Sequence, residues 1–223
     1  MYTKLNMSAL RKINCGLGLL IASFFIAFPG LSQLETAMQC VQVNQAGNAS
    51  ITWDQAMDPA SVFEQYTIHL FEPSSGLVLE TYNIPNPTDP ANPSFVNTTY
   101  DANTTELCYF VVTEGPTGTF GPSSDTLCSI HLTADPALAP GTVDLNFNSP
   151  YIGSQSPTPF AEPLSVELEE ADGSWSQIGI VADNGGMMTT PDALNECSGD
   201  LVFRVLQPNL SSNCNQQSNR AGS

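Results

Sequence analysis

The sequence contains few basic residues, and their positions limit what the protein can bind. Only 5 of its 223 residues are Lys or Arg, against 22 Asp and Glu, which gives a formal net charge of −17. Lys4, Arg11 and Lys12 lie near the N-terminus, and the other two are Arg204 and Arg220. Lys and Arg dominate the recognition of phosphate groups. The composition therefore argues against a nucleic-acid partner and against binding to an anionic membrane surface.

No apolar run of the sequence has the length of a membrane span. The run "GLGLLIASFFIAF", residues 16–28, follows the three N-terminal basic residues and ends at Pro29 and Gly30. A spanning helix needs about 20 apolar residues. The pattern therefore predicts a secretory signal peptide over residues 1–32, with a retained anchor as the alternative. Cleavage after Ser32 leaves 2 Arg against 22 acids, a formal charge of −20. We expect an extracellular or cell-surface protein that does not insert into the membrane after signal cleavage.

Stretches with the apolar spacing of an amphipathic helix are also missing from the sequence. Short runs of alternating apolar and polar residues are instead separated by clusters of Pro, Gly, Asn and Asp, a pattern typical of β-strands. The runs form two sets on either side of a Pro-rich stretch. We therefore predict an all-β chain with two tandem immunoglobulin-like sandwiches, over 33–133 and 142–223, joined by a linker over 134–141. A single large sandwich is the alternative.

Large apolar side chains on one side of these runs are expected to fill the two cores. In the first set, Trp53 ends the run "ASITW", and Tyr66 and Ile68 alternate with His69 in "QYTIHLF". In the second set, Phe147 stands near the place that Trp53 holds in the first. An aromatic ring at such a position removes a large apolar area from water. The expected core residues are Trp53, Tyr66, Ile68, Tyr109, Val111, Phe147, Phe203 and Val205.

The order of these runs resembles a known family. The segments "ITWDQA", "FEQYTIHLF", "ELCYFVV" and "SDTLCSI" resemble a fibronectin type III-like domain, with a Trp on the second strand and a Tyr at the start of the third. The second half is similar to the domain that follows it in large secreted bacterial surface proteins associated with gliding motility and type IX secretion. The resemblance covers nearly all of residues 38–223.

The sequence departs from that family at its C-terminal end. Relatives usually run on through many more domains to a sorting domain, whereas this chain stops at "NRAGS", where the last strand should still be pairing. Either the chain is the N-terminal part of a larger protein or its sorting signal is missing. We therefore expect the last strand of the second sandwich to be truncated.

Five cysteines follow the predicted signal peptide, and an exported location favours disulfides. If the hairpin between the sixth and seventh strands is centred on Gly118, Cys108 lies directly opposite Cys128, within disulfide reach. We predict a Cys108–Cys128 bond. Cys197 and Cys214 are poorly placed to pair unless the segment "CSGD" folds back. The odd number leaves one free or intermolecular thiol, and Cys40 is the expected one.

Motifs that carry catalytic chemistry are missing from the sequence, including G-x-S-x-G, H-E-x-x-H and the phosphate-binding loop. His69 and His131 are expected to face solvent. Glu167 and Glu169 share one face of a strand, but nothing apolar surrounds them to raise a pKa, so they are not expected to form a glycosidase-like pair. We expect a protein that is not an enzyme, with no catalytic, cofactor-binding or metal-binding residue. Ca²⁺ bound in an Asp- and Asn-rich loop such as "NPTDPAN" or "VADNGG" is the alternative.

The expected function is that of a non-catalytic structural or adhesion module, the N-terminal part of a larger multidomain protein, whose partner is a surface protein or polysaccharide. Binding is expected at the sandwich ends, in segments 83–103 and 115–121. The alternative is a carbohydrate-binding or accessory module of an extracellular enzyme, which would present aromatic side chains on an open face. Trp175 is the candidate ligand platform for that alternative, unless it packs over the sheet beside Ile178.

Overall fold

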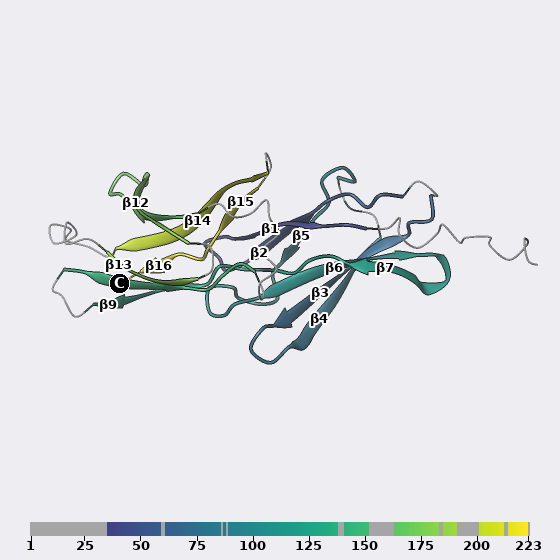
Figure 1. Ribbon diagram of the computed structural model, residues 1–223, viewed down its shortest axis with the longest axis horizontal. Coiled ribbons are helices and arrows are strands. Elements are labelled where there is room, and N and C mark those ends of the chain that lie inside the picture. Colours follow the sequence, from purple (N-terminus) through teal and green to yellow (C-terminus); the bar gives the residue numbers. More distant parts are fainter. Residues whose placement is uncertain are drawn as a thin grey trace, which may run out of the picture. The chain divides into compact units, whose positions relative to one another are not determined.

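The computed structural model of the chain describes residues 35–58, 61–85, 87, 89–137, 141–151, 163–182, 185–190, 201–211 and 214–222 (Figure 1). The predicted signal peptide and Cys197 lie outside these ranges. The described part is built from β-strands, together with a 3₁₀ turn at Pro116–Gly118. None of its helical segments has the length and apolar character that crossing a membrane requires. The expectation of an all-β chain is therefore confirmed.

The first β-sandwich has a three-stranded and a larger sheet, both antiparallel. The smaller sheet has the order β1–β2–β5 and the larger sheet the order β4–β3–β6–β7, with β8 also paired to β6. The bounds of these strands are β1 Met38–Val43, β2 Ala49–Trp53, β3 Gln65–Glu72, β4 Leu77–Ile84, β5 Ser94–Asn97, β6 Cys108–Gly115, β7 Thr119–Ser123 and β8 Leu127–Cys128.

The second sandwich repeats this strand order. Its sheets are β9–β10–β13 and β12–β11–β14–β15, and β16 also pairs with β14. In both sandwiches the first, second and fifth strands form one sheet, and the seventh strand is split into two pieces along the sixth. The bounds are β9 Leu132–Pro136, β10 Val143–Phe147, β11 Leu164–Glu169, β12 Trp175–Val181, β13 Gly186–Thr189, β14 Val202–Ser211, β15 Cys214–Gln217 and β16 Ala221–Gly222. The chain therefore folds into two tandem fibronectin type III-like sandwiches.

The structure differs from the expected linker at its N-terminal end. Residues 132–136 form β9, which pairs with β10, so residues 132–133, expected at the end of the first sandwich, and residues 134–136, expected in the linker, belong to the second sandwich. The strand was missed because it lies at a sheet edge, where Pro136 is tolerated and only Leu132 is fully buried. The last strand, expected to be truncated, is represented by β15 and β16, which both pair with β14.

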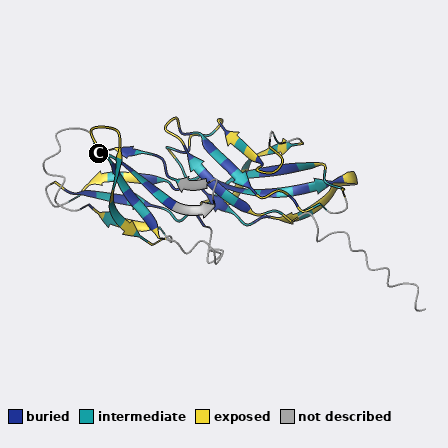
Figure 2. Ribbon diagram, turned by 90° about the horizontal axis from the view of Figure 1, so that it is seen from above, coloured by how far each residue is buried: buried dark blue, intermediate teal, exposed yellow. Residues whose placement is uncertain are grey.

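Each sandwich encloses its own apolar core. Figure 2 shows buried residues alternating with more exposed ones along the strands, as period-two patterning requires. The indole ring of Trp53 meets the ring of Tyr66 edge-on, with centroids 5.3 Å apart. All eight expected core residues are at most 7% exposed: Trp53, Tyr66, Ile68, Tyr109 and Val111 in the first cluster, and Phe147, Phe203 and Val205 in the second.

The turn between β1 and β2 shows how local sequence fixes the strand ends. The side-chain oxygen of Asn44 accepts hydrogen bonds from the backbone N–H groups of Ala46 and Asn48. Gly47 has a φ of +79°, and a Cβ at this position would lie 1.9 Å from a carboxylate oxygen of Asp101. Because only glycine combines that backbone conformation with so close an approach, the turn depends on Gly47.

The break in the seventh strand of the first sandwich is closed by two side chains, those of Ser124 and Asp125. The Ser124 hydroxyl accepts the N–H of Val111 at 2.9 Å, and the Ser124 N–H donates to the Val111 carbonyl. Asp125 reaches the other sheet and accepts the N–H of Met38 in β1 at 2.9 Å. We call these two residues the latch. It satisfies a buried donor of the sixth strand and ties the first strand to the seventh.

The second sandwich carries a latch at the equivalent place. Ser218 accepts the N–H of Val205 at 2.8 Å, and Asn219 accepts the N–H of Leu132 at 2.6 Å. The Asn219 side-chain nitrogen also donates to the Leu132 carbonyl at 2.9 Å, a bond that a carboxylate cannot make. In both sandwiches the Asp or Asn and its partner on the first strand are 87 residues apart.

The difference between the two latches predicts that Asp125→Asn stabilises the first sandwich at neutral pH. Burial raises the pKa of Asp125, the hydrogen bond from Met38 opposes this shift, and the charge of Asp54 adds to it. A carboxyl whose pKa is raised in the folded state contributes folding stability below pH ~4, and this stability is lost as the pH rises. The ionised carboxylate of Asp125 therefore lowers stability at pH 7. The amide removes that charge and adds a donor, for a gain of about 1 kcal/mol.

Denaturant unfolding at pH 7 and pH 3.5 measures this gain, with Asn219→Asp as the matched reverse change. We expect Asp125→Asn to stabilise at pH 7 and much less at pH 3.5, and Asn219→Asp to destabilise at pH 7. Equal free energies of unfolding for the wild type and Asp125→Asn at pH 7 would contradict the proposed difference between the latches.

Candidate functional site

The outward face of the larger sheet of the first sandwich is the most unusual surface in the described part of the chain. Directly opposed residues of antiparallel strands share one face. Ile68 opposes Val111 in the core, so the next residues, His69 and Phe110, oppose each other on the outside. The same face carries Phe71, which opposes Val78 on β4. Part of a face that solvated sandwiches normally fill with polar residues is therefore aromatic and aliphatic.

The aromatic rings on this face pack against one another. The rings of His69 and Phe110 are stacked, with centroids 4.6 Å apart and an angle of 11° between their planes. Phe71 is tilted against Phe110, with centroids 6.0 Å apart. His69, Phe71 and Phe110 are half-buried, whereas Val78 is 49% and Phe120 60% exposed. We call these side chains, together with Val112 on β6, the aromatic face.

The two histidines are more constrained than the sequence indicated. His69 does lie on the outward side of its strand, but it is stacked rather than freely solvated. Burial lowers the pKa of His69 below its ordinary value, and the charge of Glu114 opposes that shift. A ring nitrogen of His131 lies 3.1 Å from the carbonyl oxygen of Asn103. At neutral pH the aromatic face therefore presents a neutral imidazole.

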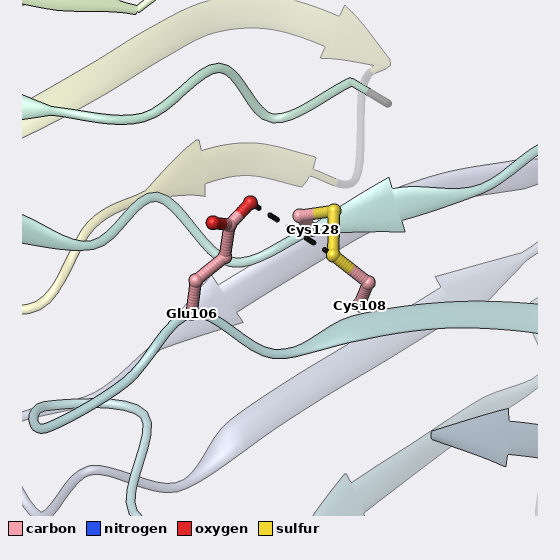
Figure 3. Close-up of side chains that lie close together, drawn as sticks. All are labelled: Glu106, Cys108 and Cys128. Atoms are coloured by element: carbon pink, nitrogen blue, oxygen red, sulfur yellow. Dashed lines mark hydrogen bonds between the residues drawn. A yellow bond between two sulfur atoms is a disulfide. The ribbon is translucent and has the colours of Figure 1, made fainter. Parts of the chain in front are cut away.

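The structure contains the predicted disulfide between Cys108 and Cys128. The two residues are directly paired across β6 and β8, with Cα atoms 3.9 Å apart. Figure 3 shows the carboxylate of Glu106 beside this bond, with one oxygen 3.9 Å from the sulfur of Cys108. A disulfide sulfur carries no proton to donate, so we interpret the 3.9 Å approach as packing. Because the two sulfurs are bonded to each other and neither is a thiolate, the three side chains form no metal site in this state.

The expectation that Cys40 has a free thiol is wrong. Cys40 lies in β1, is 1% exposed and is disulfide-bonded in the structure. Its partner lies outside the described side chains. The odd number of cysteines after the predicted signal peptide did not identify the unpaired one, because a buried strand position is suited to a disulfide as well as to a thiol.

Trp175, the candidate ligand platform, is held by Arg204 and Arg220, the two arginines that follow the predicted signal peptide. The guanidinium carbon of Arg204 lies 4.0 Å from the centroid of the Trp175 ring, and that of Arg220 lies 5.1 Å from it. Arg204 also pairs with Glu167 at 2.6 Å, and Arg220 pairs with Glu169 at 3.2 Å. The ring is half-buried and takes part in a cation–π arrangement. It is not an open platform of the kind that carbohydrate binding requires.

The tyrosines that would extend such a platform are also engaged. Tyr151 is 6% exposed, and Tyr82 packs against Phe95 with ring centroids 4.5 Å apart. Burial raises the pKa of Tyr82 to about 12, and a hydrogen bond to Glu80 adds to this shift. The rings of Tyr82 and Tyr151 therefore serve packing.

A cavity of about 420 Å³ opens among the loops of the first sandwich, where it includes the start of the expected binding segment 83–103. The rings of Phe63 and Tyr66 form part of its wall, with centroids 4.6 Å apart. The carboxylate of Asp58 lines it too, but its two oxygens accept the N–H groups of Val62 and Phe63. The cavity is lined by Gln55, Ala56, Asp58, Phe63, Glu64, Tyr66, Pro85, Pro87 and Pro90.

In the segment "NPTDPAN", Asp89 forms a turn with the residues that follow it. The carboxylate of Asp89 accepts hydrogen bonds from the N–H of Ala91 and the side-chain amide of Asn92, both at 3.0 Å. These two bonds hold the pKa of Asp89 below its ordinary value. The turn therefore accounts for Asp89 and Asn92, two of the residues that the sequence offers as Ca²⁺ ligands. Part of the other loop, "VADNGG", lies outside the described residues.

Comparisons with known proteins found similar chains among solved structures alone. Searches of protein families and of curated proteins gave no match. Among solved structures, the chain is similar to a segment of two fibronectin type III domains from chicken tenascin, with 14% identity and a TM-score of 0.31, covering 85% of this chain and 95% of that one. It is also similar to the human OSCAR ligand-binding domain, with 17% identity and a TM-score of 0.29, covering 83% and 94%. The fold assignment above rests on strand order and not on these scores.

The environment of His69 predicts that mild acidification destabilises the first sandwich. Because the pKa of His69 is lowered in the folded state, His69 contributes folding stability above its unfolded-state pKa near 6.5. This stability is lost as the pH falls through the folded-state pKa. Unfolding free energies measured at pH 8 and pH 5.5 should therefore differ more for the wild type than for His69→Gln. An identical pH dependence of the two proteins would show that His69 is as easily protonated in the folded state as in the unfolded chain.

Proposed function

We propose that the chain is a non-catalytic structural and adhesion module of an exported protein, displayed at the cell surface. Immunoglobulin-like and fibronectin type III-like sandwiches are typical of such modules. Large secreted proteins of bacterial gliding motility and type IX secretion, which the sequence resembles, would place this chain in the N-terminal part of a longer array.

The observation that supports adhesion is the aromatic face of the first sandwich. Both sandwiches enclose their own cores, so the apolar side chains on this face are not needed to complete the fold. His69, Phe71 and Phe110 are nevertheless grouped on a solvent-facing sheet. Apolar patches of this kind on exported domains usually mark interaction surfaces.

Two further features favour an extracellular, structural role. The Cys108–Cys128 disulfide suits an oxidising compartment. The acidic surface, with 22 acids against two Arg after the predicted signal cleavage, suits a protein that must stay soluble outside the cell. The carbohydrate-binding alternative is not proposed, because Trp175 is covered by Arg204 and Arg220.

Location and adhesion can be tested together in the source cells. We expect N-terminal sequencing of the exported protein to begin at Gln33, an antibody against it to label intact cells, and a deletion strain to attach less well to surfaces. Complementation with the wild-type gene serves as the control. A protein that keeps residues 1–32 and stays inside the cell, or a deletion strain with unchanged attachment, would contradict the proposal.

A further inference from the structure

The stacking geometry of the aromatic face limits what can bind there. The 4.6 Å between the ring centroids of His69 and Phe110 is close to the spacing of neighbouring strands, about 4.8 Å. Two nearly parallel rings at that spacing on adjacent strands cover each other's faces and turn their edges outward. A flat sugar ring stacks on an exposed aromatic face, and the two faces that His69 and Phe110 turn toward each other are not available to it. Ring edges and aliphatic side chains are suited to apolar side chains of a polypeptide.

The charge around the aromatic face limits the partner further. Residues 33–133 contain eleven Asp and Glu and no Lys or Arg. On β6, Glu114 follows Phe110 and Val112 and opposes Gln65 on the same outward face, whereas Glu106, just before β6, packs beside the Cys108–Cys128 disulfide. An occupant that carries positive charge next to an apolar stretch would complement Glu114 and the acidic first sandwich.

A second copy of the same chain does not meet that requirement. The two arginines after the signal segment, Arg204 and Arg220, are both paired with glutamates and stacked on Trp175. If two copies met through their aromatic faces, two acidic first sandwiches would lie against each other, and neither contains a Lys or Arg to neutralise the charge. The partner must therefore supply the positive charge from a different protein.

We propose that the aromatic face, centred on His69, Phe71 and Phe110, binds a polypeptide of another protein that presents apolar side chains flanked by Lys or Arg. The proposal deepens the adhesion role and rests on it. The apolar side chains of the partner cover the ring edges of the face, and its basic residues approach Glu114 and the other acidic residues of the first sandwich. Such a surface selects its partner by charge and by apolar area together.

The probe for this interaction is a blocked nonapeptide with Lys at its first and last positions, Val at the third, fifth and seventh, and Thr between. This spacing places the three Val and the two Lys on one side of an extended chain, with a Lys at each end, so that a Lys can reach Glu114 in either chain direction. One control peptide has Glu in place of both Lys, and a second has Ser in place of the three Val. Calorimetric titration into the full-length exported protein measures affinity, and NMR follows the ring protons of His69.

We expect the Lys/Val peptide to bind about tenfold more tightly than the Lys/Ser peptide, and the Glu/Val peptide not to bind. Binding should weaken as salt is added and should shift the His69 resonances. Phe110→Thr, which keeps a good strand former, should reduce affinity about tenfold. Val96→Thr, at a 50% exposed position on β5 in the other sheet, should leave it unchanged. Thermal unfolding checks that both variants fold.

Three outcomes would overturn the inference. Equal affinity for the Lys/Val and Lys/Ser peptides would show that charge alone drives binding and that the apolar side chains add nothing. Unchanged binding by a folded Phe110→Thr protein would place the site elsewhere. A dimer in sedimentation analysis that Phe110→Thr dissociates would identify a second copy as the occupant. None of these results bears on export, surface display or attachment of cells, so failure of the inference is distinguishable from failure of the proposed function.

Discussion

Each sandwich in this chain depends on a serine hydroxyl that takes the place of a backbone carbonyl. The seventh strand is interrupted at Ser124 in the first sandwich and at Ser218 in the second. Its backbone hydrogen bonds to the sixth strand therefore come in two separate pieces. Without the hydroxyl, the buried N–H of Val111 or Val205 would lose its acceptor. The break frees the next residue to reach the first strand of the opposite sheet. The serine hydroxyl, which replaces a backbone carbonyl as acceptor, therefore allows the two sheets of each sandwich to be joined.

The two latches also show that the sandwiches are copies of one plan. Val205 and Ser218 lie 94 residues after Val111 and Ser124, and Phe147 lies 94 residues after Trp53. The copies have diverged where the latch meets the first strand, with a carboxylate in one and an amide in the other. The outward faces of the two larger sheets also differ. The first carries the aromatic face, and the second carries Trp175 stacked with the two arginines. A shared interior thus supports two different surfaces.

Period-two alternation was enough to predict the β-sandwich class and to identify the core side chains, because burial on one side of a strand is a local property. The Cys108–Cys128 pairing was predicted from a hairpin centred on Gly118, but the pairs at the tip, such as Gly115 with Thr119, are centred on residue 117. Register shifts farther along the hairpin restore the predicted pairing. That agreement could not have been foreseen, because each shift depends on tertiary contacts such as the Ser124 hydrogen bond.

The features that the sequence did not reveal depend on contacts between distant segments. The sequence predicts residues 132–133 of β9 as the end of the first sandwich and residues 134–136 as linker, since an edge strand with Pro136 lacks the usual pattern. The alternation of Phe110 with core residues was visible, but only the pairing with β3 shows that it stacks on His69. Trp175 was considered as a platform because nothing in its own segment points to Arg204 or Arg220.

The measurement that tests the central claim most directly compares Ser124→Ala with Ser123→Ala by denaturant unfolding, using the fluorescence of Trp53. Ser124 is buried and accepts the Val111 N–H, whereas its neighbour Ser123 is exposed. The account predicts a loss of about 1–3 kcal/mol for Ser124→Ala, because a buried donor loses its acceptor, and a change within about 0.5 kcal/mol for Ser123→Ala. Equal stability of the two variants would contradict it.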